Sequence, residues 1–220
     1  MKRIVFLLLF SSIYNPFFGQ HIVKKSVESS SDKIEIYLNK IDNLVLKSDS
    51  ISKVLVKLLD AQENYSNIKL VKEKGRVIIK GNDPLPTQNI LNKFCVEQVN
   101  FASYEITVPQ KRNVYINIGS GNLLADNFSG NIKAEIETGE VNFKNIKGSI
   151  NLSIIDGDVK VTIKKAGLNL KSNLGKIYTN LNSQNLKIHP HKIEGFFKDN
   201  KQKVTIKAIK ANIYVDAVKD

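Results

Sequence analysis

The chain has 220 residues, of which 42% are hydrophobic and 25% are charged, and these ordinary values exclude disordered, collagen-like and low-complexity proteins. Its single cysteine, Cys95, excludes an intramolecular disulfide framework and a zinc cluster built from several cysteines. The net charge of +12 comes from 30 lysines and only 3 arginines, so we expect no nucleic-acid partner, because arginine is the residue that reads guanine edges and phosphates in bidentate contacts. A solvated lysine-rich surface and an attraction to anionic envelope polymers or lipid head groups both fit this charge.

The first twenty residues have the pattern of a secretory signal peptide. Lys2 and Arg3 precede an apolar run over residues 4–10. The whole apolar stretch, residues 4–18, is shorter than the ~20 residues that a membrane-spanning helix needs. We therefore predict that residues 1–20 are removed, that the processed chain does not span a membrane, and that it is exported to the periplasm or cell surface of a bacterium.

Residues 21–113 are predicted to form short β-strands that precede a more regular region. The predicted strands are residues 34–38, 44–47, 53–59, 67–72, 76–80 and 103–108, and residues 81–94 are a predicted connector. They form either the first coils of a stack or a separate cap. Stacking is favoured, because the open end of a stack is an exposed strand edge that needs cover.

The second half of the chain repeats every eighteen residues. Glycines recur at this step at Gly121, Gly139, Gly157 and Gly175. Two apolar columns follow the same step, Val114, Ile132, Ile150, Leu168, Leu186 and Val204, and Ile116, Ala134, Leu152, Leu170, Ile188 and Ile206. Alternating apolar positions predict a strand with one buried face, and glycine permits the turn that follows it.

This repeat predicts an all-β fold in which coils stack and pair in parallel at about 4.8 Å. We predict a parallel β-solenoid, a single-stranded β-helix with two strands per 18-residue coil and six coils over residues 114–220. A hexapeptide left-handed helix is excluded, because it would need aliphatic residues at Ser120 and Asp126. The fifth coil is irregular, and we predict a bulge or protruding turn between His189 and Gly195, around Pro190.

Several glycine motifs carry a resemblance to a known family. They include Gly-Ser-Gly-Asn at 119–122, Thr-Gly-Glu at 138–140 and Asp-Gly-Asp-Val at 156–159. With the upstream strands, they make the chain resemble the putative-adhesin family of bacterial domains of unknown function, whose relatives include head-domain and GIN-type adhesins. The resemblance implies an exported β-solenoid of the cell envelope and brings no catalytic residues with it.

Candidate residues for metal binding or catalysis are few. The possible metal ligands are two histidines around Pro190 and a group of carboxylates at the predicted turns: His189 and His191, and Glu137, Glu140, Asp156 and Asp158. Exposed turns account for both groups more simply. No nucleophile elbow is present, and Cys95 has no histidine near it in sequence. We predict no catalytic residue, no metal and no cofactor.

One outward column contains aromatic residues on the last three coils. It contains Tyr178, Phe196 and Tyr214, which would form a flat surface on which sugars or partner proteins stack. The favoured hypothesis is an exported, non-enzymatic, adhesin-like β-solenoid that binds an envelope polymer, glycan or protein partner through these residues. The alternatives are a polysaccharide-active β-helix enzyme, which would need a groove with clustered carboxylates and lysines, and a purely structural envelope component.

Overall fold

The computed structural model describes residues 23–59, 68–73, 75–81 and 101–218, and the regular secondary structure of these ranges consists of β-strands. The predicted all-β class is therefore confirmed. No helix in the described ranges is long and apolar enough to cross a membrane. The predicted signal peptide, most of the predicted connector and Cys95 fall outside these ranges.

The named strands join one mixed sheet with parallel and antiparallel pairs. Those of the first half are β1 (Val23–Glu28), β2 (Lys33–Asp49), β3 (Lys53–Leu59), β4 (Lys69–Glu73), β5 (Arg76–Lys80) and β6 (Ser103–Pro109). Those of the second half are β7 (Arg112–Asp126), β8 (Gly130–Lys144), β9 (Ile150–Ile163), β10 (Ala166–Ser172), β11 (Ile177–Thr179), β12 (Leu186–His189), β13 (Lys192–Phe197), β14 (Lys203–Ala208) and β15 (Asn212–Ala217). The long strands β2, β7, β8 and β9 each contain a bend.

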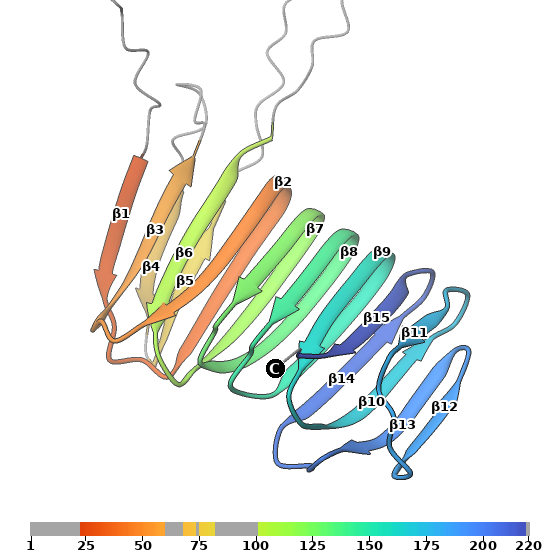
Figure 1. Ribbon diagram of the computed structural model, residues 1–220. Helices are drawn as coiled ribbons and strands as arrows, with labels where there is room; N and C mark the ends of the chain where they lie inside the picture. Colours follow the sequence, from red (N-terminus) through yellow and green to blue (C-terminus); the bar gives the residue numbers. More distant parts are fainter. Residues whose placement is uncertain (1–22, 60–67, 74, 82–100, 219–220) are drawn as a thin grey trace, which may run out of the picture.

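Three stacked coils, β7, β8 and β9, form the centre of the molecule, and Figure 1 shows their bends in a row along one edge. Val114 pairs with Ile132, and Ile132 pairs with Ile150, in parallel. These pairs join residues that are eighteen positions apart. The two predicted strands of each coil are the two arms of one continuous bent strand.

The bends need glycine because successive coils approach each other closely there. Gly139 has a φ of 150°, and a Cβ atom on it would lie 1.9 Å from the carbonyl oxygen of Gly121. A Cβ atom on Gly157 would lie equally close to the carbonyl oxygen of Gly139. Any side chain at these positions would collide with the backbone of the coil before it.

The two arms of each coil belong to two layers that enclose one apolar core. The first layer has the order β4, β5, first arm of β2, first arms of β7, β8 and β9, β14, β10, β13 and β12. The second layer has the order β1, β3, β6, second arm of β2, second arms of β7, β8 and β9, β15 and β11. Inward side chains such as Ile34, Ile116, Phe128 and Phe143 are fully buried, whereas the outward ones are free to form a functional surface.

The strands before residue 112 continue the same stack. β2 forms a coil on β7, with Ile34 beside Val114 in the first layer and Leu44 beside Leu123 in the second. The coil has a register shift between Lys40 and Asn43. Next to β2, β5 and β6 still pair with it in parallel. Beyond them the strands β4, β3 and β1 pair antiparallel, so β4 and β1 are the edge strands at this end.

At the other end, the structure corrects the predicted order of the coils. The coil formed by β14 and β15 lies between β9 and β10: Val204 pairs with Ile150 on one side and with Leu168 on the other. The last coil of the sequence is thus inserted into the stack instead of closing it. β10 and β14 have the same alternating aliphatic pattern, so either could pair with β9.

The fifth eighteen-residue window forms an antiparallel hairpin and not a parallel coil. β12 and β13 pair with each other around a turn at Pro190, and β13 pairs antiparallel with β10, where Ile193 lies beside Leu170. The predicted position of Leu186 next to Leu168 is wrong, since Gly195 occupies it. Pro190 has no amide hydrogen to donate to a parallel ladder, which explains why the chain reverses there.

Candidate functional site

Two tyrosines lie side by side on the outer face of the first layer. Tyr37 is on β2 and Tyr115 is on β7, each between buried aliphatic residues, because successive side chains of a strand point to opposite faces. Their ring centroids are 5.7 Å apart and their planes are inclined at 61°, which is an edge-to-face contact. This pair is the aromatic part of the candidate site.

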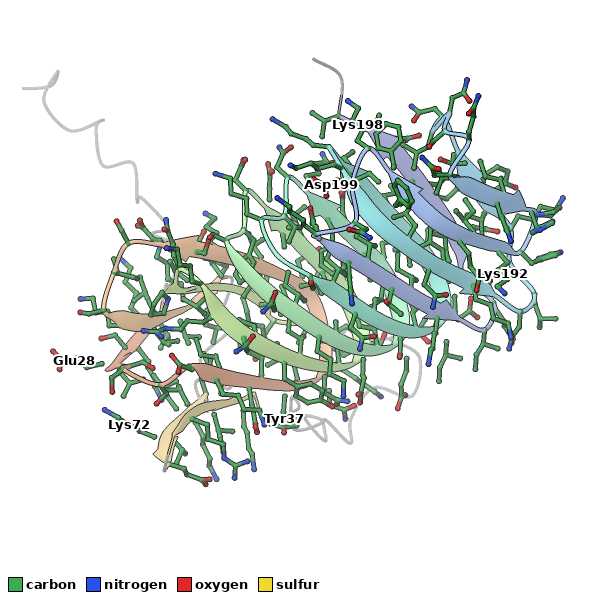
Figure 2. All side chains as sticks on the ribbon, turned by 90° about the horizontal axis from the view of Figure 1, so that it is seen from below. Glu28, Tyr37, Lys72, Lys192, Lys198 and Asp199 are labelled. Carbon is green, nitrogen blue, oxygen red and sulfur yellow. The ribbon has the colours of Figure 1, made fainter. Side chains whose placement is uncertain are left out.

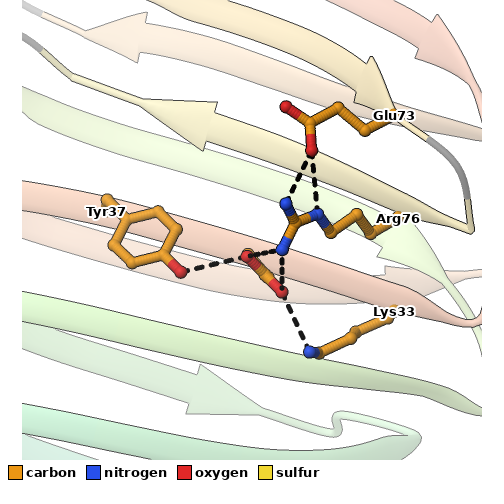
Figure 3. Close-up of polar contacts among 5 residues, drawn as sticks. Lys33, Tyr37, Glu73 and Arg76 are labelled. Atoms are coloured by element: carbon orange, nitrogen blue, oxygen red, sulfur yellow. Dashed lines mark hydrogen bonds and ion pairs between the residues drawn. The ribbon is translucent and has the colours of Figure 1, made fainter.

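Glu35 is the buried centre of a polar network, and Figure 3 labels the other members, Lys33, Tyr37, Glu73 and Arg76. Its carboxylate accepts a 3.0 Å hydrogen bond from the Tyr37 hydroxyl and lies 3.0 Å from Lys33 Nζ. Arg76 Nη1 lies 3.4 Å from the same carboxylate, and its Nη2 lies 2.6 Å from Glu73. These contacts connect β2 to β4 and β5 and fix the orientation of the tyrosine.

Glu135 on β8 accepts a hydrogen bond from the Tyr115 hydroxyl, as Glu35 does from the Tyr37 hydroxyl. The Tyr115 hydroxyl donates a 2.7 Å hydrogen bond to Glu135 Oε2, and Lys133 Nζ lies 3.0 Å from Glu135 Oε1. The Lys133 ammonium also lies 5.1 Å from the centroid of the Tyr115 ring, within cation–π range. Both tyrosine hydroxyls are therefore held by carboxylates.

A groove of about 520 Å³ lies over the two tyrosines, Glu35 and the two lysines Lys33 and Lys133. Besides the tyrosines, glutamate and lysines, it is lined by amide side chains: Asn113, Asn131 and Asn151. Asn131 Nδ2 donates to Asn113 Oδ1 at 2.9 Å, and Asn131 Oδ1 accepts from the Ser149 backbone N–H at 2.9 Å. Aromatic faces beside amides and carboxylates can stack on a sugar ring and exchange hydrogen bonds with its hydroxyls.

The electrostatics keep the carboxylates ionised and the phenols neutral. The hydrogen bond from Lys33 lowers the pKa of Glu35, although its burial acts in the opposite direction. The hydrogen bonds from Tyr115 and Lys133 lower the pKa of Glu135. Burial, and then the neighbouring carboxylate, raises the pKa of Tyr37 and of Tyr115. The donors and acceptors of the groove thus stay in place at neutral pH.

Replacement of Glu35 by Gln tests this network. At neutral pH we expect the free energy of unfolding to fall by about 1 kcal/mol, because two partly exposed cations lose their partner. A carboxyl group with a lowered folded pKa stabilises the protein above its unfolded pKa, and this contribution is lost as the pH falls through the folded value. The difference between wild type and Glu35→Gln in urea unfolding should therefore shrink in acid.

Glu28→Gln is the matched control, because Glu28 is exposed and makes no ion pair within the described residues. At neutral pH it should unfold like the wild type. A difference between wild type and Glu35→Gln that stays constant into strong acid would contradict the assigned pKa direction.

The comparisons place this fold in a family. Residues 12–216 match the Toastrack DUF4097 family, a domain of unknown function. The chain belongs to this family. A putative cell adhesion protein from Clostridium sporogenes has a similar structure, with a TM-score of 0.66 and 15% sequence identity over 91% of this chain and 100% of that chain. A putative adhesin from Bacteroides fragilis aligns with 90% of this chain and 97% of that chain, at 10% identity and a TM-score of 0.34. No curated protein matches the chain.

The first of these structures shows a shared fold, and the family assignment brings no catalytic residues to this Toastrack chain. A functional interpretation of the groove over Tyr37 and Tyr115 therefore depends on the geometry of the groove and not on the family.

Two of the three residues predicted to bind a partner lie together. Tyr178 on β11 stacks on Tyr214 of β15, with ring centroids 5.0 Å apart and planes inclined at 12°. Tyr178 is 47% exposed and borders a groove of about 350 Å³ that Pro190 also lines. Phe196 is not part of this stack: it lies on β13 beside Gly167, because the fifth window is a hairpin of the first layer.

The possible metal ligands do not converge. Within the described ranges, no group of three or more His, Cys, Asp or Glu side chains lies close enough to hold a metal ion. His191 Nδ1 lies 2.7 Å from the carbonyl oxygen of Gly175, and Asp158 accepts a 3.2 Å hydrogen bond from Asn212. The absence of a metal or cofactor stays a prediction.

Proposed function

We propose that this protein is an exported, non-enzymatic, adhesin-like β-solenoid that binds an envelope glycan through the groove over Tyr37 and Tyr115. Export to the periplasm or cell surface, and a closer kinship with head-domain or GIN-type adhesins, belong to the same proposal. The parallel coils β7, β8 and β9 act as a rigid support for the groove. Tyr178 and Tyr214 remain a second proposed contact surface, and Phe196, which lies apart from them on β13, remains a proposed contact residue.

The observation that carries this proposal is the combination of two oriented tyrosines with fixed hydrogen-bonding groups along a line of neighbouring strands. Tyr37, Tyr115 and Lys133 lie on β2, β7 and β8, which are adjacent in the first layer. Adjacent strands are about 4.8 Å apart, which is similar to the length of one sugar residue in a β-linked polymer. A glycan that crosses the strands can therefore meet one set of groups with each sugar.

A glycosidase is the second candidate, because Glu35 lies in the groove with Lys33 and Lys133, and Glu135 is paired with Lys133 next to it. Glycoside hydrolysis needs one carboxylic acid that stays protonated until it donates to the leaving oxygen, which requires a raised pKa. The pKa values of Glu35 and Glu135 are lowered instead. This direction favours binding over hydrolysis.

Titration of residues 21–220 with soluble oligomers of β-linked N-acetylglucosamine tests the proposal, with calorimetry as the measurement. This chain contains every described residue. We expect saturable binding without release of shorter sugars, and Tyr115→Ala should weaken the affinity by about tenfold, because a stacked ring is lost.

Tyr178→Ala is the matched control, because it removes the same ring from a surface on the other layer. Weaker binding in Tyr178→Ala and not in Tyr115→Ala would move the glycan site to the second proposed surface. Release of reducing ends would support the glycosidase, and unaltered heats of binding in both variants would contradict both surfaces.

A further inference from the structure

Lysines form a row on the outer face of the first layer, near its C-terminal end. In this lysine row, Lys207 on β14 lies directly beside Lys171 on β10, which lies directly beside Lys192 on β13. Lys192 pairs with Glu194 at 2.8 Å, whereas Lys171 and Lys207 form no ion pair within the described residues. Like charges that face each other across strands repel, so an anionic partner would stabilise this row.

Three exposed aliphatic side chains lie beside the lysine row, where the coils bend. In this aliphatic ridge, Ile155 and Ile209 are each 44% exposed and Leu174 is 70% exposed. The backbone N–H of Ile209 donates to the Ile154 carbonyl at 3.1 Å, and that of Leu174 donates to the Ile209 carbonyl at 2.8 Å. The ridge therefore runs across three neighbouring coils.

The lysine row and the aliphatic ridge share one groove of about 670 Å³. Members of both line it: Lys171, Lys207, Ile155 and Ile209. Two more exposed lysines, Lys176 and Lys210, flank the ridge in sequence. Glu194 pairs with Lys192 on β13, and the acidic residues that line the groove, Glu135 and Glu137, belong to β8, so the lysines without an ion pair among the described residues, Lys207 and Lys171, lie on β14 and β10.

A soluble polyanion would match the lysines but would leave the aliphatic ridge in water. An anionic lipid surface matches both, because its head groups attract lysines and its interface accepts aliphatic side chains. We propose that this protein docks on an anionic phospholipid bilayer, with the lysine row against the head groups and the aliphatic ridge at the acyl boundary. This surface borders the glycan groove at Glu135, but its lysines and aliphatic side chains do not line that groove, and the proposal does not depend on glycan binding.

Sedimentation of residues 21–220 with vesicles of equimolar phosphatidylcholine and phosphatidylglycerol, at low ionic strength, tests the proposal. The wild type should bind these vesicles and not vesicles of phosphatidylcholine alone. The double variant Lys171→Gln/Lys207→Gln should lower the partition coefficient about 30-fold, since each lysine near an anionic surface contributes about a fivefold factor. Leu174→Ser should lower it about tenfold, because an aliphatic side chain no longer enters the interface.

The double variant Lys69→Gln/Lys72→Gln is the matched control, because it removes the same charge from β4 at the other end of the first layer. Figure 2 shows Lys72 and Lys192 at opposite ends of the molecule. The control should bind like the wild type. Equal losses in both double variants would show attraction by net charge alone and would overturn the docking surface. The absence of vesicle binding, or binding to soluble polygalacturonate alone, would overturn it as well.

Discussion

Removal of residues 203–220 is expected to unfold the C-terminal part of the stack from β10 onward. These residues form β14 and β15, whose inward side chains, including Val204, Ile206 and Ile213, are fully buried. Their loss leaves β9 and β10 without a partner on the sides that β14 occupies. In a stack that followed the sequence, the same truncation would remove one terminal coil and leave the contact between β9 and β10 intact.

Hydrogen exchange of the backbone amides separates these two arrangements. In the truncated chain, the amides of β10 and β13 should exchange as fast as those of an unfolded peptide, whereas those of β7 should remain protected. Removal of β1, an edge strand with mostly exposed side chains, is the matched control and should leave the protection of β10 unchanged. Protected β10 amides after removal of residues 203–220 would contradict the inserted coil.

The sequence repeat predicts the coils well but cannot determine their order. Val204 and Ile206 have the same spacing and character as Leu168 and Leu170, so an apolar ladder forms equally well with either coil next to β9. The order depends on which connection the chain can make. β13 of the hairpin pairs with β10 on the side away from β9, and β14 pairs with β10 on the side that faces β9.

The sequence marks the position of this hairpin but does not predict its direction. Pro190 and Gly195 indicate an irregular coil, and the turn does fall at Pro190. The antiparallel pairing of β13 with β10 depends on contacts between distant residues, such as Ile193 with Leu170. Phe196 consequently lies away from Tyr178, although the repeat places both residues in one column.

The candidate glycan groove could not be found from the repeat alone. Tyr115 occupies an outward column of the repeat, but Tyr37 lies before the regular region. The two rings meet because β2 forms a coil without the glycine pattern, with a register shift at Lys40 in place of the glycine bend. An outward tyrosine in each of two predicted strands is the only available signal, and their pairing becomes visible only in three dimensions.

Replacement of Gly139 by Ala is expected to lower the free energy of unfolding by about 4 kcal/mol or more, and thus to remove most of the stability of an ordinary domain. The new Cβ would lie 1.9 Å from the carbonyl oxygen of Gly121, a backbone atom that cannot rotate away. Gly139 also has a φ of 150°, which is unfavourable for a residue that has a Cβ atom. This clash could be relieved only if β7 and β8 separated at the bend.

Gly75→Ala is the matched control for this prediction. Gly75 has a φ of 75°, but apart from Gly75 itself and its two chain neighbours nothing lies within 4 Å of its ideal Cβ position, so Ala there should cost only about 1 kcal/mol of conformational strain. Urea unfolding followed by circular dichroism measures both variants. Equal losses would mean that φ alone makes glycine necessary. A much larger loss in Gly139→Ala would mean that the close stacking of bends requires glycine, which is why the eighteen-residue repeat marks this fold in the sequence.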